Sequence, residues 1–226
     1  MHEKTHENIK TIRPLKDGVI ADFHAAEHMI RGLIKMIDSG KRFIPVSHRM
    51  VICIPSGITE VEKRAVRDSA EHAGAKEVYM IHEPLAAAIG IGINIERPVG
   101  SMIVDIGGGT TEIAIIALSG IVTDQSIRVA GDSFTDDILD YMKRQHNLLI
   151  GERSAEKIKI EVGSAMTELK DAPEDLDIRG RDLVSGIPKT IEVSSDEVRL
   201  ALKDPVNQIV EAVKRCLEQT PPELAA

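Results

Sequence analysis

Three consecutive glycines interrupt an apolar stretch of the chain and constrain its fold more than any other feature. The segment reads Asp105-Ile106-Gly107-Gly108-Gly109-Thr110-Thr111-Glu112, and apolar runs precede and follow it. Glycine lacks a Cβ atom, so its backbone can closely approach a ligand, and successive N–H groups can converge on phosphate oxygens. The pattern therefore predicts a phosphate-binding hairpin between two strands. A plain glycine-rich turn is the alternative, but it does not explain three glycines between an aspartate and two threonines.

The residues beside the glycines narrow the type of phosphate site. A Walker loop or a dinucleotide fingerprint requires a helix after the glycines, whereas a β-branched strand follows here. Asp105 ends a buried strand, where it is predicted to orient a hydrated Mg²⁺, which usually keeps several waters. Thr110 can donate its hydroxyl to a phosphate or to an attacking water. These two residues make the hairpin a candidate for chemistry as well as binding.

Composition excludes several other classes. The net charge of −8 argues against a nucleic-acid partner, because phosphate backbones are bound by clustered Lys and Arg. No apolar run approaches the ~20 residues that span a bilayer, and no signal peptide opens the chain. A cytoplasmic protein is therefore expected. Cys53 and Cys216 belong to no metal-binding pattern, so both are predicted to be buried thiols in a reducing compartment, with a disulfide between them as the alternative.

Periodicity predicts an α/β fold. In the first half, helices are expected at residues 22–37, 59–74 and 85–91, with strands at 49–55 and 77–81 between them. This alternation is typical of a largely parallel sheet. Further on we expect strands at 101–105, 112–118 and 121–129, helices at 133–149 and 154–169, a hairpin of 176–182 with 189–193, and a last helix after 194 that Pro205 interrupts.

The last residues have the pattern of a helix start. Thr220-Pro221-Pro222-Glu223 supplies an N-cap, a proline at the first position and a glutamate at the third. Only three residues follow, too few for a helix. A truncated sequence is the expectation, and a frayed natural C-terminus is the alternative.

The glycine hairpin resembles the second phosphate loop of the superfamily of actin, sugar kinases and DnaK-type chaperones. Within it, the chain resembles the MreB family of bacterial actins along essentially its whole length. The segments that carry the resemblance are residues 13–22, 54–59, 83–90, 105–112 and 151–159, of which the first and last are the most specific. The first phosphate hairpin of the family, with its Asp-x-Gly-Thr motif, and the loop that covers the adenine are not found, so weak or no binding of ATP by this chain alone is expected.

The resemblance implies an actin-like (ribonuclease H-like) two-lobed ATPase fold, here incomplete, with a smaller inserted α+β subdomain. Residues 1–98 would be the remainder of the first lobe. Residues 99–133 and 194–226 would form the incomplete core of the second lobe, and 134–193 the inserted subdomain.

The resemblance also assigns roles to residues outside the hairpin. Glu83 would position or activate the water that attacks the γ-phosphate, although an acid before Pro84 is equally a favourable helix start. The helix with Ala155, Glu156, Lys157, Ile158 and Lys159 would border the adenosine, with Glu156 and Lys159 contacting the ribose and base. From spacing alone, this pair also fits a solvated helix face.

The function implied is that of an actin-like cytoskeletal protein that binds ATP and Mg²⁺ and hydrolyses ATP slowly. It would form filaments at the inner face of the cell membrane that direct cell-wall elongation and maintain rod shape, with itself, RodZ and the elongation machinery as partners. The alternatives are a DnaK-type chaperone or sugar-kinase-like ATPase fragment, or a nucleotide-free remnant. No sugar pocket can be identified, and no substrate-binding domain follows the nucleotide lobes.

A loop in the first lobe is a candidate membrane anchor. Phe43 and Ile44 lie among basic residues, between the helix that ends before Gly40 and the strand near Met50. The resemblance implies an apolar loop in this lobe that inserts into lipid, and basic neighbours attract anionic headgroups. The alternative is that Phe43 packs under the adjacent helix as a core residue.

Overall fold

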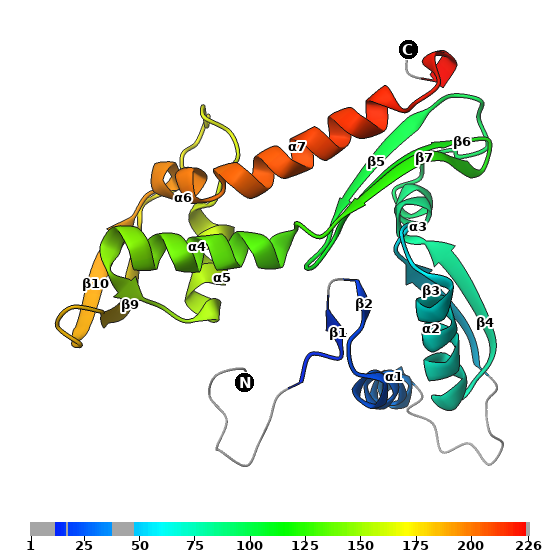
Figure 1. Cartoon of the computed structure of the whole chain (residues 1–226), viewed down its shortest axis with the longest axis horizontal. Coiled ribbons are helices and arrows are strands. Elements are labelled where there is room, and N and C mark those ends of the chain that lie inside the picture. The colour runs from blue at the N-terminus through cyan, green and yellow to red at the C-terminus, as the bar shows by residue number, and fades with distance from the viewer. Residues whose placement is uncertain (1–11, 17, 38–47, 225–226) are drawn as a thin grey trace. The chain divides into compact units, whose positions relative to one another are not determined.

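The computed structural model describes residues 12–16, 18–37 and 48–224 (Figure 1). Phe43 and Ile44 lie outside the described residues. The chain divides into two compact units. Unit 1 comprises the described residues of Met1–Asp105, Thr110–Arg128 and Arg215–Ala226, and unit 2 comprises Ile106–Gly109 and Val129–Lys214. The expected assignment of residues to two lobes and an inserted subdomain stays a prediction.

Unit 1 begins with a short hairpin followed by helices and strands in alternation. Its first elements are β1 (Leu15–Lys16), β2 (Val19–Ile20), α1 (Phe23–Ile37), β3 (His48–Ile54), α2 (Glu60–His72), β4 (Ala75–His82) and α3 (Glu83–Gly90). The helix start expected at residue 59 is confirmed and carries a capping box: Thr59 Oγ1 accepts the Glu62 N–H at 3.2 Å, and Glu62 Oε2 accepts the Thr59 N–H at 2.8 Å. Local sequence thus determines where this helix begins.

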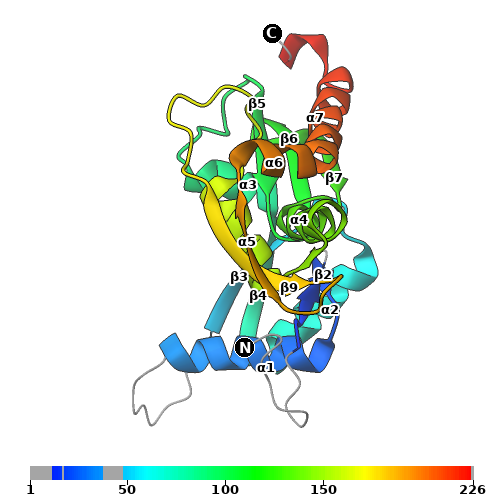
Figure 2. The same ribbon diagram turned by 90° about the vertical axis from the view of Figure 1, so that its left-hand side faces the viewer.

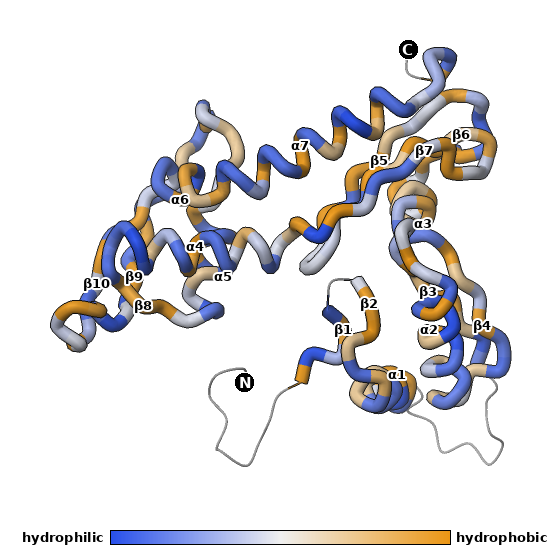
Figure 3. The backbone as a smooth tube through the Cα atoms, viewed as in Figure 1, coloured by the Kyte–Doolittle hydropathy of each residue, from blue (hydrophilic) through white to orange (hydrophobic). Residues whose placement is uncertain are grey.

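A three-stranded sheet carries the glycine hairpin. It consists of β5 (Ser101–Ile106), β6 (Thr111–Ala117) and β7 (Gly120–Ile127), with β6 in the middle. Every residue of β6 is buried, and apolar residues lie along β5 and β6, as the orange colour in Figure 3 shows. Ile103 and Ile116 pack against Ala88 of α3. The sheet therefore holds the ends of the hairpin on a rigid core.

The parallel pairing expected from the strand–helix alternation of the first half is confirmed for β3 and β4, and the other described pairs differ. Among the described strands with a defined register, only β3 and β4 pair in parallel. The pairs β1–β2, β6–β7, β8–β9 and β9–β10 are antiparallel. Between β6 and β7 stand only Leu118 and Ser119, at φ 49° and 63°, and a two-residue turn with positive φ joins antiparallel strands. Parallel strands need a crossover of a dozen or more residues.

Unit 2 packs helices against a small antiparallel sheet. Its elements are α4 (Gly131–His146), β8 (Leu148–Leu149), α5 (Glu152–Val162), β9 (Leu176–Asp182), β10 (Pro188–Val193), α6 (Ser195–Ala201) and most of α7 (Lys203–Glu218). The β9–β10 hairpin lies to one side of α4 and α5 (Figures 1 and 2). Ile138 and Met142 of α4 meet Ile158 and Val162 of α5 in the core. The predicted hairpin of 176–182 with 189–193 is confirmed.

One predicted helix ends earlier than expected, and one predicted interruption is confirmed. The helix expected at 154–169 ends at Val162, because Gly163 adopts an extended conformation at φ −69° and ψ 136°. The interruption expected near Pro205 is confirmed: α6 ends at Ala201, and Pro205 lies in the first turn of α7, where proline is tolerated. The helix start expected at Thr220-Pro221-Pro222-Glu223 is followed only by a single 3₁₀ turn, Pro222–Leu224.

The two cysteines differ in burial. Both are free thiols, and Cys216 is buried as predicted. Cys53 is exposed, contrary to prediction, because β3 alternates and Val51 and Cys53 share its exposed face. Among the described residues, none of the helices has the length and apolar character that crossing a bilayer requires.

Candidate functional site

The glycine hairpin is anchored at two points to the start of α4, within unit 2. Gly107 O accepts the Gly131 N–H at 3.0 Å, and Gly108 O accepts the Asp132 N–H at 2.7 Å. A Cβ atom on Gly131 would lie 3.2 Å from Gly107 O, a tight contact, so glycine favours this approach. Gly107, Gly108 and Gly109 are not at positive φ. These glycines therefore allow the backbone to come close to neighbouring groups, and they do not serve an unusual backbone conformation.

The predicted adenosine-binding residues of α5 meet the same end of α4. Lys159 Nζ donates to Gly131 O at 2.8 Å and lies 2.7 Å from Glu156 Oε2. It also donates to Thr135 Oγ1 at 3.0 Å. The side chain of Lys159 is 18% exposed, whereas that of Glu156 is 46% exposed. The structure thus brings Glu156 and Lys159 to the base of the glycine hairpin.

The other three residues predicted on α5 lie differently. The side chains of Ala155 and Ile158 are fully buried in the core of unit 2, so only their backbone could reach a ligand. Lys157 lies on the opposite, solvent-facing side, where its Nζ is 3.7 Å from Glu161 Oε2.

The carboxyl group of Glu83 in unit 1 is influenced by two neighbouring carboxylates. The pKa of Glu83 is raised above its ordinary value, mainly because the carboxyl is partly buried and further because Glu112 and Asp105 place negative charge nearby. A carboxylate with a raised pKa is a better proton acceptor, which fits the predicted role of Glu83. The N-cap of α3 is His82, and Glu83 stands in the first turn, where its charge also favours the helix.

Glu112 is a member of this site that residue patterns alone did not single out. It is 1% exposed. Its Oε2 accepts the backbone N–H of Ser56 at 2.9 Å, and its Oε1 accepts the hydroxyl of Ser126 at 2.6 Å. A charged residue inside an otherwise apolar strand was the available signal, since a buried charge needs partners.

Thr110 lies under the β1–β2 turn. Its exposed fraction is 9%. Gly18 has φ +75°, and a Cβ atom there would lie 3.1 Å from both Thr110 Cγ2 and Pro55 Cγ. Three of the segments that resemble the MreB family, 13–22, 54–59 and 105–112, therefore converge in unit 1 at Thr110.

A magnesium ion fits this site only together with phosphates. The described part of the chain holds no group of three or more His, Cys, Asp or Glu side chains arranged around a metal. Mg²⁺ is usually bound through one or two carboxylates, waters and substrate phosphates rather than by a protein cage. Asp105 at the end of β5, close to the hairpin, suits that form of binding.

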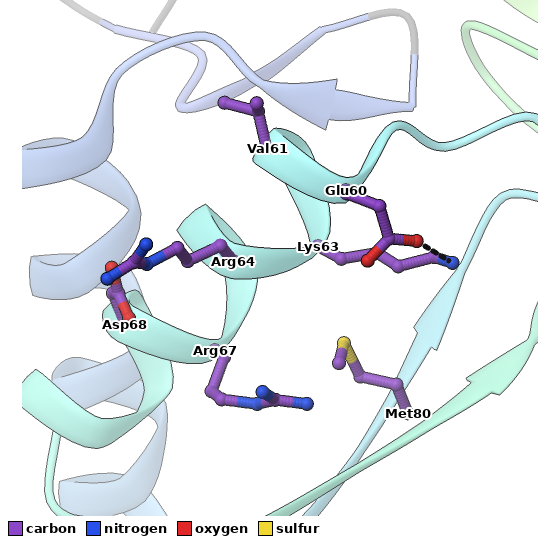
Figure 4. A pocket seen from close by; sticks show the side chains of 7 residues that line it. All are labelled: Glu60, Val61, Lys63, Arg64, Arg67, Asp68 and Met80. Carbon is purple, nitrogen blue, oxygen red and sulfur yellow. Dashed lines mark hydrogen bonds and ion pairs between the residues drawn. The ribbon is translucent and has the colours of Figure 1, made fainter.

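The described part of unit 1 has hollows of different character. One, of about 530 Å³, is mainly apolar, and Gly18, Pro55 and Glu83 line part of it. The other, of about 680 Å³, lies along α2 and is lined by charged side chains, among which Lys63 pairs with Glu60 at 2.8 Å (Figure 4). None of the predicted site residues lines the second hollow.

Comparison with known proteins decides the family. The pattern of the family "MreB/Mbl protein" matches residues 1–226. The chain belongs to the MreB/Mbl family. It is 48% identical to the cell shape-determining protein MreB of Escherichia coli K12 and 51% identical to the cell shape-determining protein Mbl of Bacillus subtilis 168, over 99% of this chain in both cases. It spans 63% and 66% of the length of these two relatives.

Solved structures agree with this placement. The structure of MreB5 of Spiroplasma citri bound to ADP superposes with a TM-score of 0.90 at 41% identity, over 98% of this chain and 65% of that one. The same protein bound to AMPPNP gives a TM-score of 0.89 at 42% identity, over 99% and 66% of the two chains. The predicted actin-like fold and the resemblance to the MreB family are confirmed.

Proposed function

We propose that this chain is the nucleotide-binding part of an actin-like cytoskeletal protein that maintains cell shape. The observation that carries the proposal is the glycine hairpin, whose carbonyls are bonded to the start of α4 beside Lys159 and Glu156. Its support from outside the chain is twofold. The relatives are named for determining cell shape, and the similar MreB5 structures are bound to ADP and to AMPPNP.

The ligand we propose is ATP with Mg²⁺. The N–H groups of Gly107, Gly108 and Gly109 would take the phosphates, and Asp105 would hold the ion through water. When bound, the ion would neutralise charge on the phosphates. Helix α5, which carries Glu156 and Lys159, would border the nucleoside.

Slow hydrolysis is the proposed reaction. Glu83 would accept a hydrogen bond from the attacking water and hold it in line, since positioning supplies most of the catalysis of phosphoryl transfer. The raised pKa of Glu83 makes its carboxylate a stronger acceptor than an ordinary glutamate. Thr110, nearly buried under the β1–β2 turn, would donate its hydroxyl to the water or to a phosphate.

Assembly is the proposed outcome of nucleotide binding, with further copies of the same protein as the partner. RodZ and the cell-wall elongation machinery are proposed as partners of the filament, at the inner face of the membrane.

Phe43 and Ile44 are the proposed contact with lipid. Filaments with these two residues changed to Ser should no longer pellet with anionic liposomes; unchanged pelleting by a folded double variant would exclude this loop as the anchor.

The nucleotide site is tested by titrating a full-length protein that contains this segment with Mg-ATP while following backbone amide signals, because the chain alone is expected to bind ATP weakly or not at all. Saturable shifts are expected at Gly107–Gly109 and along α5. Gly108→Ala is the test variant, because its new Cβ would meet only the Asp132 carboxylate, at 3.8 Å. It should fold, yet place a methyl group where phosphate must approach. Gly32→Ala on α1 is the matched control, since nothing lies within 4 Å of the added atom.

Two results would contradict the proposal. One is the absence of any shift at the hairpin up to millimolar nucleotide. The other is equal binding by Gly108→Ala and the control. Sedimentation of a full-length protein with this segment distinguishes a filament protein from a DnaK-type or sugar-kinase-like ATPase. A filament protein pellets in an ATP-dependent manner, and a soluble enzyme does not.

A further inference from the structure

A buried hydroxyl lies at the centre of the contacts between α4 and α5. Thr135, one turn after Gly131 in α4, is 3% exposed. Its Oγ1 lies 3.0 Å from Gly131 O, 2.8 Å from Glu156 Oε2 and 3.0 Å from Lys159 Nζ. All four residues belong to unit 2. A hydroxyl with one proton and two lone pairs can satisfy these neighbours only by accepting from Lys159 and donating to one of the two oxygens.

The ammonium of Lys159 is directed into the protein. It has three protons and lies within hydrogen-bonding distance of three oxygens: Gly131 O at 2.8 Å, Thr135 Oγ1 at 3.0 Å and Glu156 Oε2 at 2.7 Å. In this structure, therefore, its hydrogen-bonding capacity is used within unit 2. The half-exposed carboxylate of Glu156 is the part of the group that faces solvent.

A single residue, Gly131, connects this group of side chains to the glycine hairpin. Gly131 O accepts from Lys159 Nζ and lies within hydrogen-bonding distance of Thr135 Oγ1, and the Gly131 N–H donates to Gly107 O at 3.0 Å. The next N–H, of Asp132, donates to Gly108 O at 2.7 Å. An added Cβ on Gly131 would lie 3.5 Å from Lys159 Nζ. The carbonyl that Thr135 and Lys159 hold thus belongs to the peptide segment that holds the hairpin.

We propose that Thr135 is a positioning residue that, with Lys159, fixes the first turn of α4 and through it the glycine hairpin. This inference rests on the proposed function, and it divides the α5 residues into two roles. Lys159 supports the hairpin from beneath, and Glu156 is the group that contacts the sugar of a nucleoside polyphosphate. Loss of the Thr135 hydroxyl then disturbs phosphate binding itself, whereas loss of the Glu156 charge disturbs only nucleoside binding.

Hydrogen exchange on the 226-residue chain tests the support without any ligand. Thr135→Val keeps the shape of the side chain and removes its hydroxyl, and Thr135→Ser restores the hydroxyl. In Thr135→Val, the amides of Gly131 and Asp132 should exchange about tenfold faster, because the turn that holds them has lost a buried hydrogen bond. Thr135→Ser should stay within about twofold of wild type. Thr190→Val, at an exposed position of β10 in the same unit, is the matched control and should change neither amide.

Ligand binding tests the division of roles. Calorimetric titration of a full-length protein that contains this segment compares Mg-ADP with magnesium pyrophosphate, which lacks the nucleoside. Thr135→Val should weaken both ligands by a similar factor, and Glu156→Gln should weaken Mg-ADP alone. Failure of wild type to bind either ligand would count against the proposed function, and the exchange experiment would still decide whether Thr135 supports the hairpin.

Three results would overturn the inference. The first is unchanged exchange at Gly131 and Asp132 in Thr135→Val. The second is a uniform rise in exchange throughout α4 and α5, which would show a role in general packing only. The third is weaker binding of Mg-ADP by Thr135→Val with unchanged binding of pyrophosphate, because the hairpin would then be undisturbed.

Discussion

Replacement of Glu112 by Ala should loosen unit 1 around the glycine hairpin. The carboxylate joins three separate segments, because it belongs to β6 and accepts from Ser56, which follows β3, and from Ser126 of β7. At 1% exposure it has almost no contact with water. Removing it leaves the Ser56 N–H and the Ser126 hydroxyl without this acceptor.

The magnitude follows from these two bonds. A hydrogen bond to a charged group contributes about 1.5–3 kcal/mol, so losing both costs roughly 3–6 kcal/mol. The substitution also removes the repulsion between Glu112 and Glu83, which helps to raise the pKa of Glu83. This gain offsets part of the lost hydrogen-bond energy. We expect the free energy of opening of β6 to fall by about 3 kcal/mol. Glu112→Gln keeps one acceptor oxygen and should lose about half as much.

Native-state hydrogen exchange of the β6 amides is the appropriate assay, since two compact units need not unfold together. The expected fall corresponds to exchange about a hundredfold faster in Glu112→Ala, at 1.4 kcal/mol per factor of ten. Glu96→Ala, at an exposed loop position, is the control. Acceleration of less than about threefold, or an equal effect of the control, would refute the view that Glu112 joins these segments.

Three further outcomes are expected. In a full-length protein with this segment, Glu83→Ala should slow ATP hydrolysis by ~10²–10⁴; lower stability with unchanged turnover would leave only the helix-start role. Because the pKa of Glu83 is raised, the hydrolysis rate should fall on acidification at a higher pH than it would with an ordinary glutamate. In a pH–rate profile, Glu112→Gln should move this fall to lower pH, because it removes one of the charges that raise the pKa. Gly180→Ala should lower the thermal stability of unit 2 by about 1–3 kcal/mol, because its Cβ would lie 2.6 Å from Leu149 O; unchanged melting would exclude this clash.

Local chemistry made many elements predictable. The capping box of Thr59 and Glu62 marked the start of α2 because its two hydrogen bonds join residues three apart. The same holds for Ser194 and Glu197 at the start of α6. Where a longer context decided, prediction failed: Cys53 looked buried in an apolar run, yet its face of β3 is exposed.

The sequence by itself determined the glycine hairpin and its place between two strands, because glycines and β-branched residues act on their own backbone. It also pointed to Asp105, Thr110, Glu83, Glu156 and Lys159, through the resemblance to the MreB family. Only the tertiary structure decided which groups these residues meet. Glu112 and Ser56 are 56 positions apart, and Lys159 and Thr135 are 24 apart. No spacing rule joins such pairs, since their hydrogen bonds exist only after the packing of distant strands and helices has brought the buried polar atoms together.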